Sequence, residues 1–191
     1  MRSSRYIGLL ALPAVLFVAA IGSTASVVTA VARQPLPAFT HTADTDWLNS
    51  APLTVEGLRG HVVLVHVWAF ACSNCYRSMP WLRALEQRYG DRGLMVVGVH
   101  TPELPEEEVP ERVASKVREF GLTHPVMLDA DYSYWRALRN EYWPAWYVVD
   151  SEGRVRTIVI GEAHAGDMRA RAVEDAIDSL LAESGVHEQP Y

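Results

Sequence analysis

The chain has 191 residues, of which 49% are apolar and 21% charged, an ordinary composition for a globular protein. This length suffices for one domain with a substantial core and is short for two. The formal net charge of −6 argues against nucleic acid as a partner, and the chain contains only two cysteines, Cys72 and Cys75.

The N-terminal residues differ from the rest of the chain. Arg2 and Arg5 precede a stretch without charged residues, residues 6–32, whose most apolar part is residues 7–21. The stretch ends in Ala-Val-Ala, a small-x-small pattern typical of a signal-peptide cleavage site. We expect residues 1–32 to be a cleaved signal peptide or a retained membrane anchor, with the rest of the protein exported to the periplasm or another extracytoplasmic space. A buried helix at the start of the globular domain is the alternative.

A predicted linker and a predicted buried strand follow. Residues 33–54 are rich in Pro, Thr, Ala and Asp and are predicted to be a linker, which leaves residues 55–191 as the globular domain. Residues 61–70 form a continuous, valine-rich apolar run, typical of a central strand. Beyond the cysteines, apolar residues at helical spacing predict a helix over residues 73–89.

The remaining predicted elements alternate between strands and helices. In chain order they begin with a strand at 94–100, an acidic proline-marked loop at 102–110 and a helix with Val109, Val113, Val117 and Phe120 inward. A strand at 125–128 and a helix at 132–140 with Trp135 and Leu138 inward follow. The last elements are a hairpin of strands at 145–150 and 154–160 and a helix at 166–183. Such alternation predicts a parallel sheet covered by helices on both faces, to which the hairpin adds antiparallel strands. The switch point of the parallel strands then falls beside the cysteines.

Cys72 and Cys75 have the spacing of a redox-active pair. They stand three positions apart where the predicted strand meets the predicted helix, so both lie on its first turn. The free N–H groups and the positive end of the helix dipole favour a thiolate at Cys72, and the thiolate is the form that attacks disulfides. We therefore expect Cys72 to attack a substrate disulfide and Cys75 to resolve the mixed disulfide, which leaves the Cys72–Cys75 disulfide oxidised.

Two other uses of a CxxC pair fit the sequence less well. A purely structural disulfide is disfavoured because closing so small a loop constrains the unfolded chain very little. A zinc site needs four ligands, normally with a second Cys or His pair at short spacing, and the sequence has no such pair. We expect neither a metal nor a cofactor.

The residues around the cysteines resemble the active-site strand and helix of the thioredoxin superfamily. The matching segment is VVLVHVWAFACSNCYRSMP, residues 62–80, with Trp68 four residues before the first cysteine and Pro80 eight residues after it. Two further segments, GVHTPE at 98–103 and the WPAWYVVD-containing segment 120–155, are similar to the exported, membrane-associated branch of TlpA, ResA and DipZ type.

This resemblance implies a thioredoxin-like fold, which is a three-layer α/β sandwich with a mixed central sheet and helices on both faces. It also implies that the Trp143–Pro144 peptide bond is cis and that Pro144 packs against the cysteine pair as part of the catalytic site. Trp68, Trp143 and Trp146 are then candidates for an apolar groove that binds a substrate or partner. Packing in the core is the alternative for these tryptophans.

Two further positions are candidates for proton transfer. His66 stands six residues before Cys72, where thioredoxins keep a buried acid, and it could serve as the base for Cys75. The alternative for His66 is a core histidine with a satisfied hydrogen bond. Glu103 matches an acid that the ResA-type branch places near its cysteines, and its alternative is a solvated carboxylate in an acidic run.

The resemblance implies a thiol–disulfide oxidoreductase. Its substrates would be protein thiols or disulfides outside the cytoplasm, and kinship with TlpA and ResA implies reducing work, such as keeping the cysteines of apocytochromes or copper sites as thiols. Electrons would come from a membrane partner of CcdA type. One alternative is a copper-binding chaperone that joins the two thiols to His100 or His164, and another is a thiol peroxidase.

Overall fold

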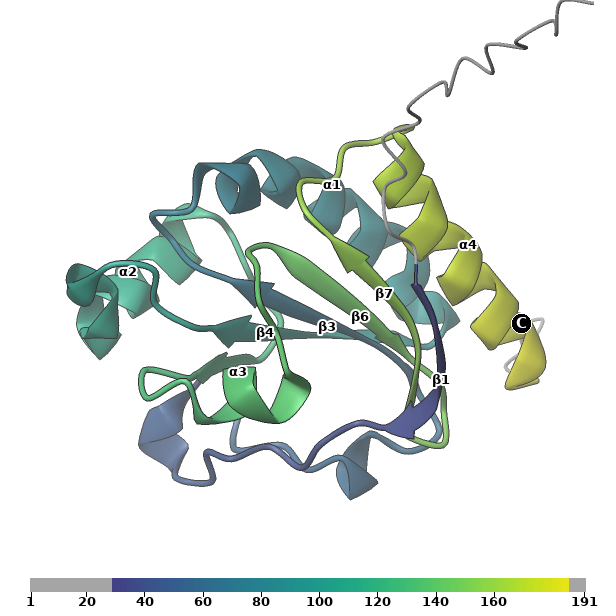
Figure 1. Cartoon of the computed structure of the whole chain (residues 1–191), viewed down its shortest axis with the longest axis horizontal. Helices are drawn as coiled ribbons and strands as arrows, with labels where there is room; N and C mark the ends of the chain where they lie inside the picture. Colours follow the sequence, from purple (N-terminus) through teal and green to yellow (C-terminus); the bar gives the residue numbers. More distant parts are fainter. Residues whose placement is uncertain (1–28, 186–191) are drawn as a thin grey trace, which may run out of the picture.

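The computed structural model describes residues 29–185, which contain one seven-stranded mixed sheet with the order β1-β7-β6-β3-β4-β5-β2 (Figure 1). The strands are β1 (Thr29–Pro35), β2 (Trp47–Leu48), β3 (Val62–Trp68), β4 (Leu94–His100), β5 (Val126–Leu128), β6 (Ala145–Val149) and β7 (Arg154–Ile160). The helices are α1 (Ser73–Tyr89), α2 (Pro110–Glu119), α3 (Ser133–Leu138) and α4 (Met168–Glu183). The predicted thioredoxin-like α/β fold is therefore confirmed.

The central strand β3 determines where the cysteines lie. All seven of its residues are buried, as its run of β-branched valines predicts. It pairs in parallel with β4, where Trp68 is opposite His100, and antiparallel with β6, where Val67 is opposite Ala145. The ends of β3 and β4 and the beginning of β6 therefore meet at one edge of the sheet, and the cysteine loop leaves from this edge.

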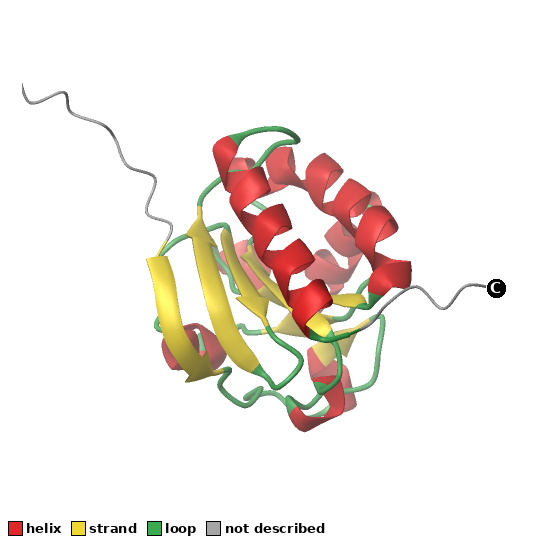
Figure 2. Ribbon diagram, turned by 90° about the vertical axis from the view of Figure 1, so that its right-hand side faces the viewer, coloured by secondary structure: helices red, strands yellow, loops and turns green. Residues whose placement is uncertain are grey.

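Helices cover both faces of the sheet, and each face has its own apolar core. Leu64 and Trp68 of β3 point into the core beneath α1, α2 and α4. Val63, Val65 and Val67 point the other way, into the core shared with α3 and with the N-terminal segment. Figures 1 and 2 show α1 and α4 lying together on one face of the sheet, and Figure 1 shows α3 on the other.

Helices α1, α2 and α4 bury the faces that their apolar spacing predicts, with one exception, whereas α3 buries Tyr134 and leaves the predicted inward residues Trp135 and Leu138 half-buried. The predicted inward residues of α1 and α4 are all buried, namely Met79, Leu82, Leu85 and Tyr89 on α1 and Val173, Ile177, Leu180 and Leu181 on α4. The exception is Val109, which is 39% exposed because it is the N-cap residue before Pro110 and lies outside the helix. The inward face of α2 consists of Val113 and Val117, with the buried Phe120 at its end.

The predicted linker at residues 33–54 is wrong, because this segment is part of the domain. Its first residues belong to β1, which pairs antiparallel with β7 and extends the sheet. Leu36, Phe39 and Trp47 are buried in the core on the α3 face, and the Trp47 indole N–H donates to the carbonyl of His41. These apolar residues are scattered among polar ones without a helical or strand period, so the composition alone suggested a linker.

The predicted signal peptide or membrane anchor lies mostly in residues 1–28, outside the described part of the chain. Strand β1 begins at Thr29, so the Ala-Val-Ala pattern at residues 30–32 falls at its start. Within residues 29–185, no helix combines the length and the apolar character that crossing a membrane would need.

Candidate active site

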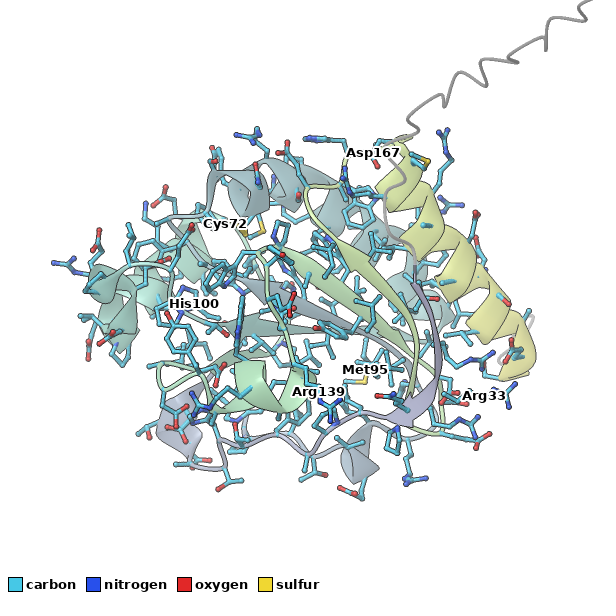
Figure 3. All side chains as sticks on the ribbon, in the orientation of Figure 1. Arg33, Cys72, Met95, His100, Arg139 and Asp167 are labelled. Carbon is cyan, nitrogen blue, oxygen red and sulfur yellow. A yellow bond between two sulfur atoms is a disulfide. The ribbon has the colours of Figure 1, made fainter. Side chains whose placement is uncertain are left out.

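Cys72 and Cys75 form a disulfide at the N-terminal end of α1 (Figure 3). Cys72 is the N-cap residue, and its sulfur accepts a hydrogen bond of 3.2 Å from the backbone N–H of Cys75. Cys72 retains 7% of its surface exposed, whereas Cys75 is completely buried. The geometry therefore makes Cys72 the sulfur that an incoming molecule can reach, and it places Cys75 directly behind it.

Pro144 lies at the same edge of the sheet as the cysteine loop. The Trp143–Pro144 bond is cis, as the resemblance implied. Pro144 is buried immediately before β6, whose first residue, Ala145, pairs with Val67 at the end of β3. Its carbonyl accepts a hydrogen bond of 2.8 Å from the backbone N–H of Gly161, the residue after β7. The predicted packing of Pro144 against the cysteine pair, as part of the catalytic site, stays a prediction.

The three candidate groove tryptophans differ in their exposure. Trp68 and Trp146 are completely buried, and the Trp146 indole N–H donates to the carbonyl of Gly161. Both side chains therefore belong to the core, and the prediction that they line a groove for substrate is wrong. Trp143 is half-buried and packs against Trp135 with the rings tilted by 36° and 4.2 Å between ring centroids. It is the tryptophan of the three that remains available to a substrate chain.

His66 is buried without a polar partner among the described residues. Its ring stacks on Trp146, with 4.1 Å between centroids and 3° between planes, and neither ring nitrogen has a hydrogen bond. Burial, reinforced by the nearby His124, lowers the pKa of His66 well below its ordinary value, so the ring is neutral near pH 7. His66 therefore lies in the core without a hydrogen bond to another described residue, and its proton-transfer role stays a prediction.

The acid beside the cysteine loop is Glu107, not Glu103. Glu103 is exposed, and its carboxylate forms no hydrogen bond among the described residues. Glu107 is 1% exposed, and one of its oxygens accepts a hydrogen bond of 2.8 Å from the backbone N–H of Ala71, the residue before Cys72. The sequence contains a signal for Glu107 that was missed: a proline at the first position and a glutamate at the third position of a short 3₁₀ helix, Pro105–Glu108.

The surroundings of Glu107 keep its carboxyl group ionised. Burial alone would raise its pKa, but the neighbouring His100 and hydrogen bonds from the backbone N–H groups of Ala71, Glu103 and Leu104 outweigh burial and lower the pKa to about 2. The His100 Nε2 atom lies 3.7 Å from the carboxylate. Glu107 is therefore a permanent negative charge at neutral pH and not a proton donor.

The cysteines take no part in a cluster of metal-ligating side chains within the described residues. One such cluster occurs there, formed by His41, Asp129 and Asp131. Asp129 is already used by the fold, because its oxygens accept hydrogen bonds from the backbone N–H groups of Tyr134 and Trp135 at the start of α3. The two histidines of the copper-chaperone alternative also have other neighbours: His100 faces Glu107, and His164 pairs with Glu162.

Comparison with known proteins places this site in a family. The redoxin family model matches residues 32–177 of the chain. The chain belongs to the redoxin family. The redoxin is 46% identical over 121 residues to the protein DipZ of Mycobacterium bovis, a match that covers 62% of this chain and 17% of DipZ. It is 33% identical over 153 residues to the thiol-disulfide oxidoreductase YkuV of Bacillus subtilis, which covers 80% of this chain and 97% of YkuV.

A solved structure agrees with these relatives. The solution structure of a thioredoxin-like protein in the oxidized form superimposes with a TM-score of 0.65 at 33% identity, over 79% of this chain and 97% of that protein. The resemblance to the DipZ-type branch of the thioredoxin superfamily is thereby confirmed. The redoxin spans less than a fifth of the length of DipZ but nearly all of YkuV.

The redoxin also has a pocket beside its cysteine helix. Its volume is about 380 Å³, and it runs along α1 toward Phe120 at the end of α2 and His164 before α4. Tyr76, the residue after Cys75, lines the pocket and is 58% exposed. An exposed aromatic side chain next to a reactive disulfide is a suitable contact for a polypeptide substrate.

Proposed function

We propose that this redoxin is a thiol–disulfide oxidoreductase that reduces protein disulfides outside the cytoplasm. The observation that carries the proposal is the unequal placement of the two sulfurs on one helical turn. Cys72 caps the helix and is accessible, whereas Cys75 is buried behind it. This placement supports attack on the substrate by Cys72 and resolution of the mixed disulfide by Cys75.

The reaction follows from this placement. In the dithiol form, the Cys75 N–H and the N-terminal end of α1 stabilise a thiolate at Cys72. The thiolate attacks one sulfur of the substrate disulfide, and the other substrate sulfur leaves as a thiolate that takes up a proton. Cys75, after losing its proton, attacks the Cys72 sulfur and releases the second substrate thiol. Two electrons have then passed from the redoxin to the substrate.

The proposal also includes the direction of electron transfer, the location of the protein and its electron donor. The resemblance to the TlpA and ResA branch supports reduction, and the basic, then apolar N-terminal residues 1–32 support export or anchoring. A membrane thiol-transporting protein of CcdA type would then return the Cys72–Cys75 disulfide to the dithiol. Apocytochrome or copper-site cysteines are suitable substrates.

Reduction of insulin driven by dithiothreitol tests the activity. We expect the wild-type protein to accelerate the reaction, and we expect both Cys72→Ser and Cys75→Ser to return it to the uncatalysed rate. A wild-type protein without acceleration would contradict the assignment as an oxidoreductase. A measured reduction potential near the roughly −120 mV of strongly oxidising dithiol proteins would instead contradict only the reducing direction.

A further inference from the structure

Glu107 is held in place by backbone groups from two segments of the chain. Its Oε1 atom accepts the hydrogen bond from Ala71 in the cysteine loop. Its Oε2 atom accepts hydrogen bonds of 2.7 Å and 2.9 Å from the backbone N–H groups of Glu103 and Leu104, in the loop after β4. The carboxylate therefore joins the loop that carries Cys72 to the loop that follows the neighbouring strand. Figure 3 shows His100, the last residue of that strand, on the same side of the molecule as Cys72.

No lysine or arginine balances the charge of Glu107 within residues 29–185. No lysine or arginine forms an ion pair with it there, and the nearest titratable group is His100 on β4. Tyr132, which precedes α3, also lies near this acidic segment, because burial and then the charges of Glu108 and Glu107 raise its pKa. The other charged groups of the same segment, Glu106 and Glu108, are exposed carboxylates. Apart from His100, the charged groups of this segment around Glu107 are therefore carboxylates.

The charge lies close to the reactive sulfur. Ala71, the hydrogen-bond donor to Glu107, directly precedes Cys72. Because consecutive Cα atoms are about 3.8 Å apart, the carboxylate lies within roughly 10 Å of the Cys72 sulfur. At an effective dielectric constant of about 20, a unit charge at this distance changes the equilibrium constant for ionisation of the Cys72 thiol by about tenfold.

We propose that Glu107 is a positioning residue that holds a permanent negative charge behind the Ala71–Cys72 segment and thereby makes the Cys72–Cys75 pair a stronger reductant. The inference rests on the proposed function. The charge disfavours a thiolate at Cys72, so it destabilises the dithiol form relative to the disulfide. The pair then gives up its two electrons more readily. Glu107 in this way opposes the N-terminal end of α1, which favours the thiolate.

Two substitutions at this position separate charge from contact. Glu107→Gln keeps the length of the side chain and removes the charge, but its amide nitrogen cannot accept, so it also loses the hydrogen bonds of one carboxylate oxygen. Glu107→Asp keeps the charge and is too short to hold the hydrogen bond to Ala71, so it measures the effect of losing contact alone. Glu106→Gln removes an exposed charge from the same 3₁₀ helix and is the matched control. Each protein is equilibrated with reduced and oxidised glutathione, where two glutathione thiols supply the two electrons and two protons that open the Cys72–Cys75 disulfide. The pH dependence of Cys72 alkylation by iodoacetamide is measured in parallel.

For Glu107→Gln, at a pH where Cys72 of the dithiol form is ionised, we expect the equilibrium with glutathione to shift about tenfold toward the dithiol, which corresponds to about 30 mV. The midpoint of its alkylation profile should move to lower pH, while Glu107→Asp and Glu106→Gln stay within about twofold of the wild type. An unchanged Glu107→Gln equilibrium would overturn the inference, as would a Glu107→Asp shift as large as that of Glu107→Gln.

The outcome remains decisive if Glu107→Gln does not fold. Glu107→Asp alone then tests the inference, because an unchanged equilibrium supports the role of the charge and a shift of fivefold or more contradicts it. Failure of the proposed function is a separate result. In that case the wild-type disulfide does not exchange with glutathione at all, whatever the variants do.

Discussion

Glu107 and His66 are both buried titratable side chains near the cysteine end of the sheet, and their surroundings are opposite. Glu107 accepts three backbone hydrogen bonds and faces His100, so it is stable as an ion. His66 lies flat against Trp146 with both ring nitrogens unpartnered within the described residues, so it is stable only as a neutral ring. Burial therefore does not by itself set a charge state; the available hydrogen-bond donors do.

Removing the acid should have the larger effect on stability. Glu107→Ala removes the charged acceptor of the backbone N–H groups of Ala71 and Leu104, and a hydrogen bond to a charged group contributes about 1.5–3 kcal/mol. We expect the free energy of unfolding in urea to fall by about 3 kcal/mol.

Glu103→Ala is the control for this experiment, because the Glu103 carboxylate is exposed and only its backbone N–H contacts Glu107. It should change the free energy of unfolding by less than about 0.5 kcal/mol. Equal losses from the two variants would mean that Glu107 is no better satisfied than a surface carboxylate.

Removing the histidine should have a smaller effect that depends on pH. The pKa of His66 is lower in the folded protein than in the unfolded chain, so the folded state resists its protonation. Its stabilising contribution is complete above about pH 6.5 and is lost as the pH falls below that value. His66→Phe preserves a flat ring against Trp146 and has no group to protonate. Between about pH 6.5 and 5.5 its free energy of unfolding should therefore fall by about 1 kcal/mol less than that of the wild type.

Below about pH 4.5, the dependence of the unfolding free energy on pH should report Glu107 instead of His66. Because the pKa of Glu107 is lowered from 4.5 to about 2, its contribution is present above about pH 4.5 and is lost as the pH falls toward 2. His66→Phe should leave this lower limb unchanged. The free energy of unfolding is measured by urea unfolding at each pH. If its slope against pH near pH 6 were the same in the wild type and in His66→Phe, the assignment of an unpartnered histidine would be contradicted.

Long apolar runs and helical spacing were sufficient to predict most of the fold. The strand at 94–100 and the strand at 154–160 have the predicted bounds, and α1 begins at Ser73 as predicted. In each case a single local pattern, a valine-rich run or an amphipathic repeat, extends over the whole element and is therefore sufficient to predict it. Residues 33–54 lack such a pattern, and only pairing of their ends with β7 and β5 shows that they belong to the sheet.

The candidate site was predictable to the extent that it is local. The CxxC spacing placed Cys72 at the N-terminus of α1, and the structure confirms that placement. Glu107 stands between two other glutamates, so choosing it over Glu103 required knowing which carboxylate turns toward Ala71. The tryptophans posed the same problem, because sequence spacing does not distinguish a completely buried Trp146 from a half-buried Trp143.

Trapping of a mixed disulfide tests most directly that Cys72 attacks and Cys75 resolves. Reduced Cys72→Ser and Cys75→Ser proteins are mixed with a disulfide-containing peptide, and adduct formation is followed by mass spectrometry. Because Cys72 is accessible and Cys75 is completely buried, Cys75→Ser should form a lasting adduct through Cys72 at least about a hundredfold faster than Cys72→Ser forms one through Cys75. Equal rates, or faster reaction of Cys72→Ser, would contradict these roles.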